Sequence, residues 1–482
     1  MRSPNTIHLR PWLLALVGCG VLLYLAGPSL TRQQPGTGDA PKKGEIGKTS
    51  YDQIAPVLVG QETFAVMMAR DKAGKASVVA RQQALLQERY DLTRRVHDKV
   101  KMVRGKPIPV GPTAKLPTGM TFEQLAKMSP EEIRSKGLFP KGYLPLPHPN
   151  HPVGGMVFPQ HQIKDFKRLE RFDLDFDLPE HVLPEFPPAI FLTTRPDLGD
   201  VSQGKVVTIE NFQDIFQGIF NSKDMEGMRL LLTQFPQQQF NATHDRKTEV
   251  ASLGVTCFDC HVNGHTSAAT HLVGDIRPQA HRRRIDTPSL RGVNVQLIFG
   301  SQRAMKTVED FAQFEQLAAY FDGDPVTAMA KGMNILDRSI QVHFMAEVMN
   351  LLDFPPAPNL RWDGKLDPKK FKADSPAMRG QKLFFGKAQC ATCHPAPYYT
   401  DNSMHNLHVE RFYAPQYVNG MMATAQGPIK TFTLRGIKES PPYFHDGRLL
   451  TLEDTVEFFN LILEADLTAQ EKQDLVAFLR QL

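Results

Sequence analysis

The alternation of apolar and polar positions divides the chain into segments of different character. An uncharged, mostly apolar run extends from Pro11 to Leu30. Apolar residues recur at helical spacing over residues 77–103, and residues 336–354 and 467–482 form two amphipathic patterns of the same period. After residue 200, no segment sustains the two-residue alternation of a half-buried strand. The pattern therefore predicts a mainly α-helical protein.

Polar and proline-rich segments interrupt the first half of the chain. Residues 31–50 form a polar linker, and residues 138–198 are rich in proline, which breaks regular structure. Between them, the sequence SPEEI predicts a helix with Ser129 as its N-cap and Pro130 at its first position. Residues 31–200 contain no motif that points to a chemistry. We expect them to form an N-terminal extension whose role the sequence leaves open.

The apolar run near the N-terminus has the features of an export segment. Two arginines precede it, and its length matches the roughly 20 residues that span a bilayer. The sequence LVGC, ending at Cys19, resembles a lipoprotein cleavage box, but apolar sequence continues beyond it. This favours an uncleaved anchor over a cleaved signal peptide; a buried core helix is the alternative. We expect residues 1–30 to be a signal anchor or signal peptide. The chain is then periplasmic and attached to the inner membrane through residues 11–30.

The chain after residue 200 contains an internal repeat. The sequence CFDCH begins at Cys257 and CATCH begins at Cys390. The blocks TPSLRG (287–292) and TFTLRG (431–436) follow them, and each leads to a helix start, TVEDF or TLEDTV. Such a repeat predicts two copies of one module. We place the first module at residues 201–355 and the second at 374–482, with a linker at 356–373.

The two C-x-x-C-H sequences carry the clearest chemical signal. Two thiols at this spacing can attach the two vinyl groups of one porphyrin, and the adjacent histidine can bind its iron. A zinc site would need the two pairs to fold together or a Cys2His2 spacing, and a redox disulfide would need a βαβ pattern. Neither alternative fits two separate modules. We predict two covalently bound c-type haems, with His261 and His394 as proximal ligands and four cysteines as attachment points: Cys257, Cys260, Cys390 and Cys393.

The charge balance bears on partners. The net charge is +5, and basic residues are interspersed with acidic ones, so no segment is typical of a nucleic-acid-binding arm.

The segment GQKLFFGKAQC (380–390) resembles the N-terminal helix of class I cytochromes c, with residues 467–482 as its packing partner. The predicted fold is therefore two cytochrome c-like haem domains in tandem, preceded by a membrane anchor and a proline-rich extension.

Residues from about 200 to 482 resemble the bacterial di-haem cytochrome c peroxidases and the related methylamine-utilisation di-haem oxidases. The resemblance rests on both haem motifs, on TPSLRG, and on PPYFHDGRLLTLEDTVEFFN (441–460). It implies that the second haem takes electrons from a small donor protein, a cytochrome c or a cupredoxin. The first haem would react with hydrogen peroxide or another small substrate. The family also contains a calcium ion between domains, although no cluster of carboxylates in this sequence points to one.

The resemblance also implies roles for individual residues. Glu309 would move protons on the distal side of the first haem, with a helix-start carboxylate as the alternative. His271 would be a distal histidine there, or a hydrogen-bond donor to a propionate or the backbone. Arg291 and Arg435 would lie near the haem propionates. Phe459 stands where the family has a methionine or tyrosine ligand to the second iron. The second haem is then five-coordinate or uses another group, with five candidates: Met404, His405, His408, Met421 and Met422.

The predicted function is a peroxidase-like di-haem oxidoreductase. Two alternatives stay open. One is an electron-transfer cytochrome without catalytic activity, and the other is an oxidase that acts on a partner protein or an organic substrate. Trp362, in the linker, is a candidate for electron transfer at the interface between the modules, with a packing role as the alternative.

Overall fold

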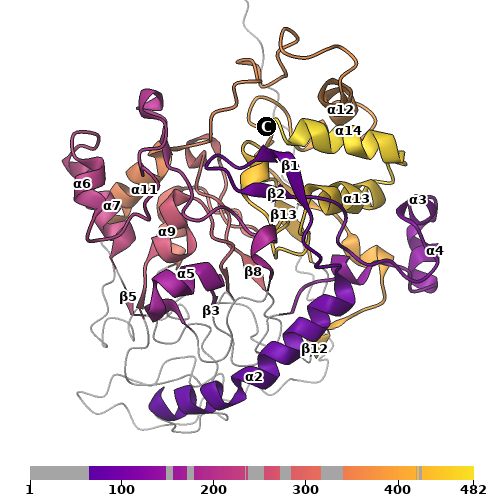
Figure 1. The fold of residues 1–482 in the computed structure, drawn as a ribbon, viewed down its shortest axis with the longest axis horizontal. Coiled ribbons are helices and arrows are strands. Elements are labelled where there is room, and N and C mark those ends of the chain that lie inside the picture. Colours follow the sequence, from indigo (N-terminus) through magenta and orange to yellow (C-terminus); the bar gives the residue numbers. More distant parts are fainter. Residues whose placement is uncertain are drawn as a thin grey trace, which may run out of the picture. The chain divides into compact units, whose positions relative to one another are not determined.

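The computed structural model describes most of the chain after residue 63 (Figure 1). The described ranges are 64–147, 156–170, 178–233, 235–236, 254–271, 284–315, 340–418, 421–422 and 426–482. The described residues all belong to one compact unit. The predicted anchor, residues 11–30, lies outside the described residues and stays a prediction. Within the described residues, every helix is too short or too polar to cross a membrane.

The N-terminal part begins with a long helix and a hairpin. Helix α2 spans Phe64–Arg89, and strands β1 (Val96–Lys101) and β2 (Pro107–Pro109) pair antiparallel. The prediction of one helix over residues 77–103 is therefore correct only for its first half. The Tyr90 hydroxyl donates to the carbonyls of Gly142 and Arg448, which stops the helix and turns the chain. Val96 and Val100 then lie in β1, where the spacing of four residues also places them on one face.

Short helices follow the hairpin. They are α3 (Phe122–Leu125), α4 (Pro130–Ser135) and α5 (Gln160–Asp165). The predicted start of α4 is confirmed, because the Ser129 side chain accepts a hydrogen bond from the Glu132 amide at 3.2 Å and Pro130 occupies the first turn. The Glu132 side chain accepts from the Ser129 amide in return. This reciprocal pair satisfies two amides that the first turn would otherwise leave exposed.

The first module contains a pair of closely packed helices. Its helices are α6 (Phe212–Phe216), α7 (Ser222–Leu232), α8 (Cys257–Cys260), α9 (Val308–Phe314) and α11 (Gln341–Leu351). Its strands are β5 (Phe235–Pro236), β6 (Gly254–Val255), β7 (Thr270–His271), β8 (Ile285–Asp286) and β9 (Leu352–Asp353). Gly227 lets α7 approach α11, because a Cβ there would lie 2.1 Å from the Phe344 carbonyl oxygen. Strands β3 (Met156–Val157), β7 and β8 form one small sheet, and β4 (Phe191–Leu192) pairs with β9.

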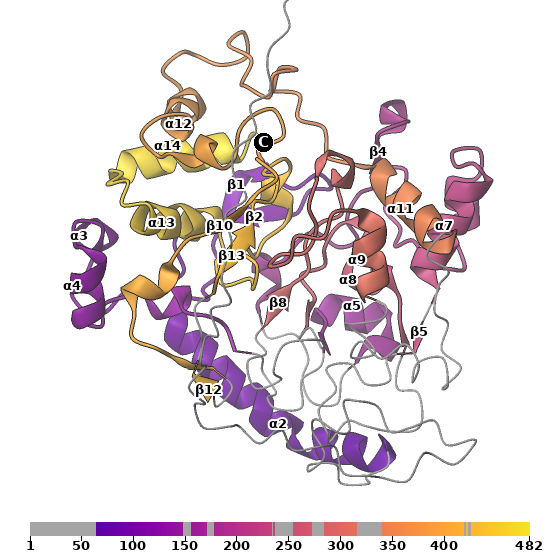
Figure 2. The ribbon, with the colours of Figure 1, turned by 180° about the vertical axis from the view of Figure 1, so that it is seen from behind.

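The second module is built on three helices: α12 (Pro376–Phe384), α13 (Leu452–Ile462) and α14 (Ala469–Leu479). Figure 2 shows them together, away from α7, α9 and α11. Its strands are β10 (Met404–Asn406), β11 (Tyr417–Val418), β12 (Met421–Met422) and β13 (Pro428–Lys430), with β10 antiparallel to β13. The predicted contact between α12 and the last helix is confirmed, because the rings of Phe384 and Phe478 lie 5.3 Å apart.

The N-terminal extension packs against both modules. Asp454, at the start of α13, accepts hydrogen bonds from the Thr113 and Ala114 amides and from the Thr113 hydroxyl. Arg168 makes a bidentate ion pair with Asp259, inside the first C-x-x-C sequence, at 2.6 and 2.7 Å. The sequence-based domain boundaries stay a prediction, but these contacts make residues 89–170 a structural support of both modules.

The contact between α12 and α14 leads to the first prediction. A Cβ on Gly380 would lie 1.9 Å from the Asp474 carbonyl oxygen, so Gly380→Ala must force the two helices apart. We expect a loss of at least about 3 kcal/mol in the free energy of unfolding. Circular dichroism melting measures it. Gly74→Ala in α2 is the control, because nothing lies within 4 Å of its Cβ. That change should stabilise the helix by about 0.5–1 kcal/mol. Equal melting temperatures for the two variants would contradict the close contact.

Candidate haem-binding cavities

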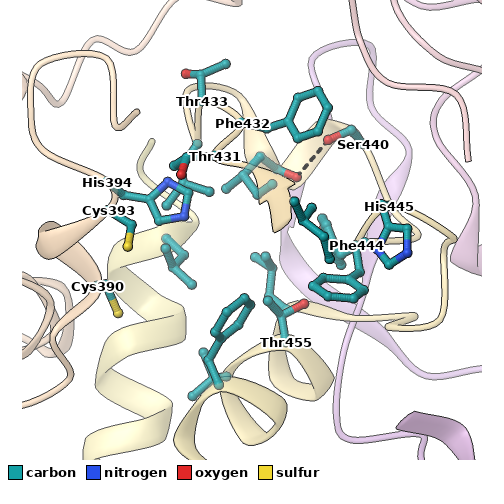
Figure 3. A pocket seen from close by; sticks show the side chains of 18 of the residues that line it. Cys390, Cys393, His394, Thr431, Phe432, Thr433, Ser440, Phe444, His445 and Thr455 are labelled. Atoms are coloured by element: carbon teal, nitrogen blue, oxygen red, sulfur yellow. Dashed lines mark hydrogen bonds between the residues drawn. The ribbon is translucent and has the colours of Figure 1, made fainter. Parts of the chain in front are cut away.

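The larger cavity lies in the second module and has a volume of about 370 Å³. Figure 3 shows Cys390, Cys393 and His394 on one side of it, with Phe444 and His445 across from them and Thr455 below. Helices α13 and α14 and the segment 429–437 supply most of its apolar wall. The second C-x-x-C-H sequence therefore opens onto a cavity, as attachment of a large planar group requires.

His394 is arranged as a metal ligand would be. Its Nδ1 lies 2.8 Å from the Tyr399 carbonyl oxygen, which can only accept, so Nδ1 carries the proton. Nε2 then keeps the lone pair that binds iron. Burial lowers the pKa of His394, which favours the neutral imidazole needed for coordination.

The smaller cavity lies in the first module and has a volume of about 130 Å³ within the described residues. Cys257, Cys260 and His261 line it. The His261 Nδ1 lies 2.8 Å from the Pro288 carbonyl oxygen, and burial lowers the pKa of His261 to about 4. In both predicted proximal histidines, Nδ1 is therefore hydrogen-bonded to a backbone carbonyl, and Nε2 is left to bind a metal.

The chemistry of the walls fits haem. Each cavity offers two thiols and a neutral histidine, and none of the described cysteines is in a disulfide. Cationic side chains suited to carboxylates also line the larger cavity, namely Arg291, Lys430 and Arg435. Two buried nitrogens of Arg291, Nε and Nη1, have no hydrogen-bond partner. A haem propionate would satisfy such atoms.

The two arginines of the repeat face one cavity. Arg291 comes from the first module but lines the larger, second cavity, and burial lowers its pKa to about 10. Its Nη2 donates to the Ala189 carbonyl at 2.5 Å. Arg435 lines the same cavity and lies over the Phe354 ring at 5.3 Å. The sequence repeat suggested equivalent places for the two arginines, but neither is among the described residues that line the smaller cavity.

Glu309, the predicted distal acid, is not among the described residues that line the smaller cavity. Its carboxylate pairs with His343 Nδ1 at 3.2 Å, and the side chain is 32 % exposed. The described wall of that cavity contains another carboxylate, Glu315, at the C-terminal end of α9. The negative charge of Glu315 contributes to the raised pKa of Cys257. Sequence reasoning missed Glu315, although it lies on the same helical segment as Glu309.

The other predicted ligands are placed as follows. The backbone of His271 lies in β7, paired with Met156 and Ile285, but its side chain is outside the described residues. Phe459 lines the larger cavity, so the position of the family ligand is occupied by a ring. His405 Nε2 lies 2.6 Å from Asp401, and His408 lies 3.5 Å from Glu410. The side chains of Met421 and Met422 are outside the described residues, and Met404 is not among the described residues that line the larger cavity.

One group of potential metal ligands occurs among the described residues: Cys393, Asp401 and His405. Since Cys393 is a predicted haem attachment point, this group gives no support to a calcium site. Trp362 is 93 % exposed, so the prediction that it lies at the interface between modules is wrong. It stands in a solvent-exposed loop, and the neighbouring Gly364 packs against Pro397, three residues after the second haem motif.

The two cavities share part of their walls. Five residues line both: Asp286, Thr287, Pro288, Ser301 and His445. His265, for which the sequence suggested no role, also lies at this seam, with Nε2 3.0 Å from the Glu439 carbonyl oxygen of the second module. Three of these residues, Asp286, Thr287 and Pro288, lie in or beside the first block of the repeat, and Ser301 and His445 each follow a block by nine residues.

Comparisons with known proteins agree with this chemistry. The chain is 34% identical over 124 residues to the methylamine utilization protein MauG of Methylorubrum extorquens, covering 22% of this chain and 34% of that protein. It is 32% identical over 133 residues to the cytochrome c551 peroxidase of Nitrosomonas europaea, covering 26% and 39%. A cytochrome-c peroxidase of Denitromonas iodatirespirans is 31% identical over 140 residues, covering 21% and 38%. The chain thus spans about two fifths or less of the curated relatives it matches.

Two solved structures are also similar. A hydrazine synthase of Kuenenia stuttgartiensis has a TM-score of 0.36 and 20% identity, covering 54% of this chain and 93% of that one. A MauG-like protein associated with microbial copper homeostasis has a TM-score of 0.34 and 18% identity, covering 64% and 95%. No protein-family model matches the chain.

The cysteine pairs lead to the second prediction. The double variants Cys257→Ala/Cys260→Ala and Cys390→Ala/Cys393→Ala should each lose one covalently bound haem, because each cavity has its own pair of thiols. The alkaline pyridine haemochrome spectrum counts haem per chain and should show one in each variant against two in the parent. Cys19→Ala is the control and should keep both. A parent protein with fewer than two haems would contradict the assignment.

Proposed function

Because the chain is similar to the di-haem cytochrome c peroxidase and MauG superfamily, we propose that it is a periplasmic di-haem c-type oxidoreductase, held at the inner membrane by residues 11–30. It would reduce hydrogen peroxide with electrons from a small donor protein. One observation carries the proposal. The structure contains two cavities that share a wall of five residues. Each cavity contains two thiols and a histidine whose Nδ1 is hydrogen-bonded to a backbone carbonyl, as in a metal-binding histidine.

The residues of the chain have distinct tasks in this proposal. The bound haems supply the iron that changes oxidation state. His261 and His394 hold the iron, and the carbonyl oxygens of Pro288 and Tyr399 fix the orientation of the two imidazoles. The larger cavity takes no ligand from Phe459, and much of its wall is apolar. Such a wall suits a centre that passes electrons without binding substrate.

The first cavity needs a group that moves protons to and from peroxide. Glu309 is the residue that the family resemblance suggests, but its carboxylate pairs with His343. Glu315 lines the cavity, so we propose it as the second candidate for the same task. His271 remains a candidate for the distal side of the first haem.

Electrons would enter at the surface beside the second haem motif. Three exposed aromatic side chains come from loops that pack on this motif: Trp362, Phe385 and Tyr398. The linker adjoining Trp362 carries exposed cations, Arg361, Lys365, Lys369, Lys370 and Lys372, and fewer carboxylates. An acidic donor protein would fit this combination, since opposite charge steers encounter and aromatic rings supply contact area.

An electron carrier without catalytic activity is the second candidate. The pairing of Glu309 with His343 supports this candidate, because it engages the proposed distal acid in another contact. An oxidase acting on a partner protein or an organic substrate is the third candidate, and the exposed Trp362 is where a large substrate would meet the chain.

The third prediction separates these candidates. With a reduced donor and hydrogen peroxide, the parent should oxidise the donor catalytically. Glu315→Gln should lower kcat/KM for peroxide by at least about 10²-fold, because general acid–base catalysis contributes that much. Glu309→Gln should leave it unchanged while both variants keep two haems. The reverse result would return the role to Glu309, and no peroxide turnover in the parent would favour the electron carrier.

The fourth prediction concerns the donor. Reversing the charges of Lys369, Lys370 and Lys372 to glutamate should raise KM for an acidic donor about tenfold at low salt, and the effect should shrink as ionic strength rises. Steady-state kinetics at several salt concentrations measure it. Lys223→Glu, exposed on the first module, is the matched control and should have no effect. Equal KM values for parent and triple variant would contradict docking here.

A further inference from the structure

Two backbone hydrogen bonds between the modules are related by the repeat. The Asp286 amide donates to the His445 carbonyl at 3.0 Å, and the Lys430 amide donates to the Ser301 carbonyl at 2.9 Å. Lys430 lies as far along the chain from Asp286 as His445 lies from Ser301. The blocks IDTPSLRG (285–292) and IKTFTLRG (429–436) align these residues directly. The modules therefore meet as two copies of one surface, each giving and receiving the same bond.

The side chains at these twin positions have opposite charge. Asp286 and Lys430 are both buried, at 9 % and 5 % exposure. Asp286 lines both cavities, and burial raises its pKa well above the usual range, which favours the neutral acid. Lys430 lines the larger cavity. The two equivalent backbone hydrogen bonds therefore involve an acidic residue, Asp286, in the first module and a basic residue, Lys430, in the second.

The printed contacts of the Lys430 ammonium are with neutral groups. Its ammonium lies 5.2 Å from the centre of the Phe299 ring and 4.7 Å from that of Phe432, and it donates to the side-chain oxygen of Gln296. Within the described residues, no carboxylate forms an ion pair with it. Burial lowers its pKa to about 7. A buried cation is costly without an anion, so the wall of this cavity lacks one negative partner.

Haem carries two propionate carboxylates, which are anions of the right kind for this place. We propose that Lys430 binds a carboxylate of the haem in the second cavity and links the redox potential of that haem to proton uptake. Its twin Asp286 supplies no such cation to the first haem. The inference rests on the proposed function only in so far as a haem occupies this cavity.

The sign of the effect follows from charge. Reduction removes one positive charge from the iron, so a nearby ammonium favours the reduced haem and raises its potential. When Lys430 loses its proton as pH rises, this stabilisation of the reduced haem is lost and the redox potential of the haem falls. The paired carboxylate raises the pKa of Lys430 above the value of about 7 set by burial. The fall should therefore occur between about pH 7 and the ordinary lysine pKa near 10.4.

Other charged groups also lie near Lys430. The pair Asp401–His405 adjoins β10, which pairs with the strand of Lys430. Arg303 belongs to the loop of the first module that contacts it, and Arg435 lines the same cavity. Burial lowers the pKa of Arg291, which lines the same cavity, to about 10 and raises the pKa of Asp286, so variants of Lys430 itself are needed to separate its titration from theirs.

The test is a spectroelectrochemical titration of both haems from pH 6 to pH 10, without peroxide or donor. In the parent, the potential of the second haem should fall as pH rises above 7. Lys430→Met should hold it at the low value throughout, because no ammonium is present. Lys430→Arg should hold it at the high value throughout, because arginine keeps its charge. Asp286→Asn is the control for a change in the shared wall, and Lys365→Met is the control for loss of a surface lysine. In both, the potential of the second haem should fall with pH as it does in the parent.

Two results would overturn the inference. One is a parent whose second haem shows no pH dependence above pH 7, and the other is a Lys430→Met protein that keeps the slope. If Lys430→Met fails to retain the second haem, Lys430→Arg decides alone: a flat, high potential supports the inference and the slope of the parent overturns it. Because the assay contains no peroxide, failure of the peroxidase proposal leaves this result unaffected.

Discussion

A buried ion pair between Asp446 and Arg448 is the interaction on which the surrounding structure depends. Both side chains are almost fully inaccessible, and Arg448 binds both carboxylate oxygens of Asp446. The pair also makes two hydrogen bonds to the N-terminal extension. The Leu146 amide donates to Asp446, and Arg448 donates to the Tyr143 carbonyl. Removing either partner would leave a charge buried without compensation, which costs about 3–5 kcal/mol.

The position of this pair connects it to the candidate site. Asp446 follows His445, which lines both cavities, so the pair holds the segment on which the two modules meet. Arg448 keeps the pKa of Asp446 at about 2 despite its burial. A depressed carboxyl pKa stabilises the fold above the unfolded value near 3.9, and this stability is lost as pH falls toward 2. At neutral pH the Asp446 carboxylate is therefore ionised and the ion pair with Arg448 is intact.

The sequence predicts the parts of this structure that short-range spacing determines. The Ser129 cap depends on local chemistry and the contact of Phe384 with Phe478 depends on one helix meeting another, and both are found as predicted. Glu309 shows the limit. A helix start tells where a carboxylate lies along the chain but not which way the helix is turned, and His343, on another helix, decides that.

Long-range packing explains the other differences. Arg291 reaches the second cavity because the modules meet closely at the seam, which no local pattern in either copy reveals. The helix predicted through Val96 ends at Arg89 because the carbonyl of Arg448, far along the chain, accepts from Tyr90. The role of residues 31–200 was open for the same reason: their partners Asp259 and Asp454 lie in distant motifs.

Burial of the cysteines sets an order of events for assembly. In the folded cavities, burial raises the pKa of the Cys257 and Cys390 thiols to about 12. At neutral pH only about one thiol in 10⁵ would then be ionised, and the thiolate is the reactive form. Attachment through such thiols is slow once the cavity has closed around them. If haem is attached as proposed, the thiols of Cys257 and Cys390 would react most readily while the segments that carry them are still open to solvent.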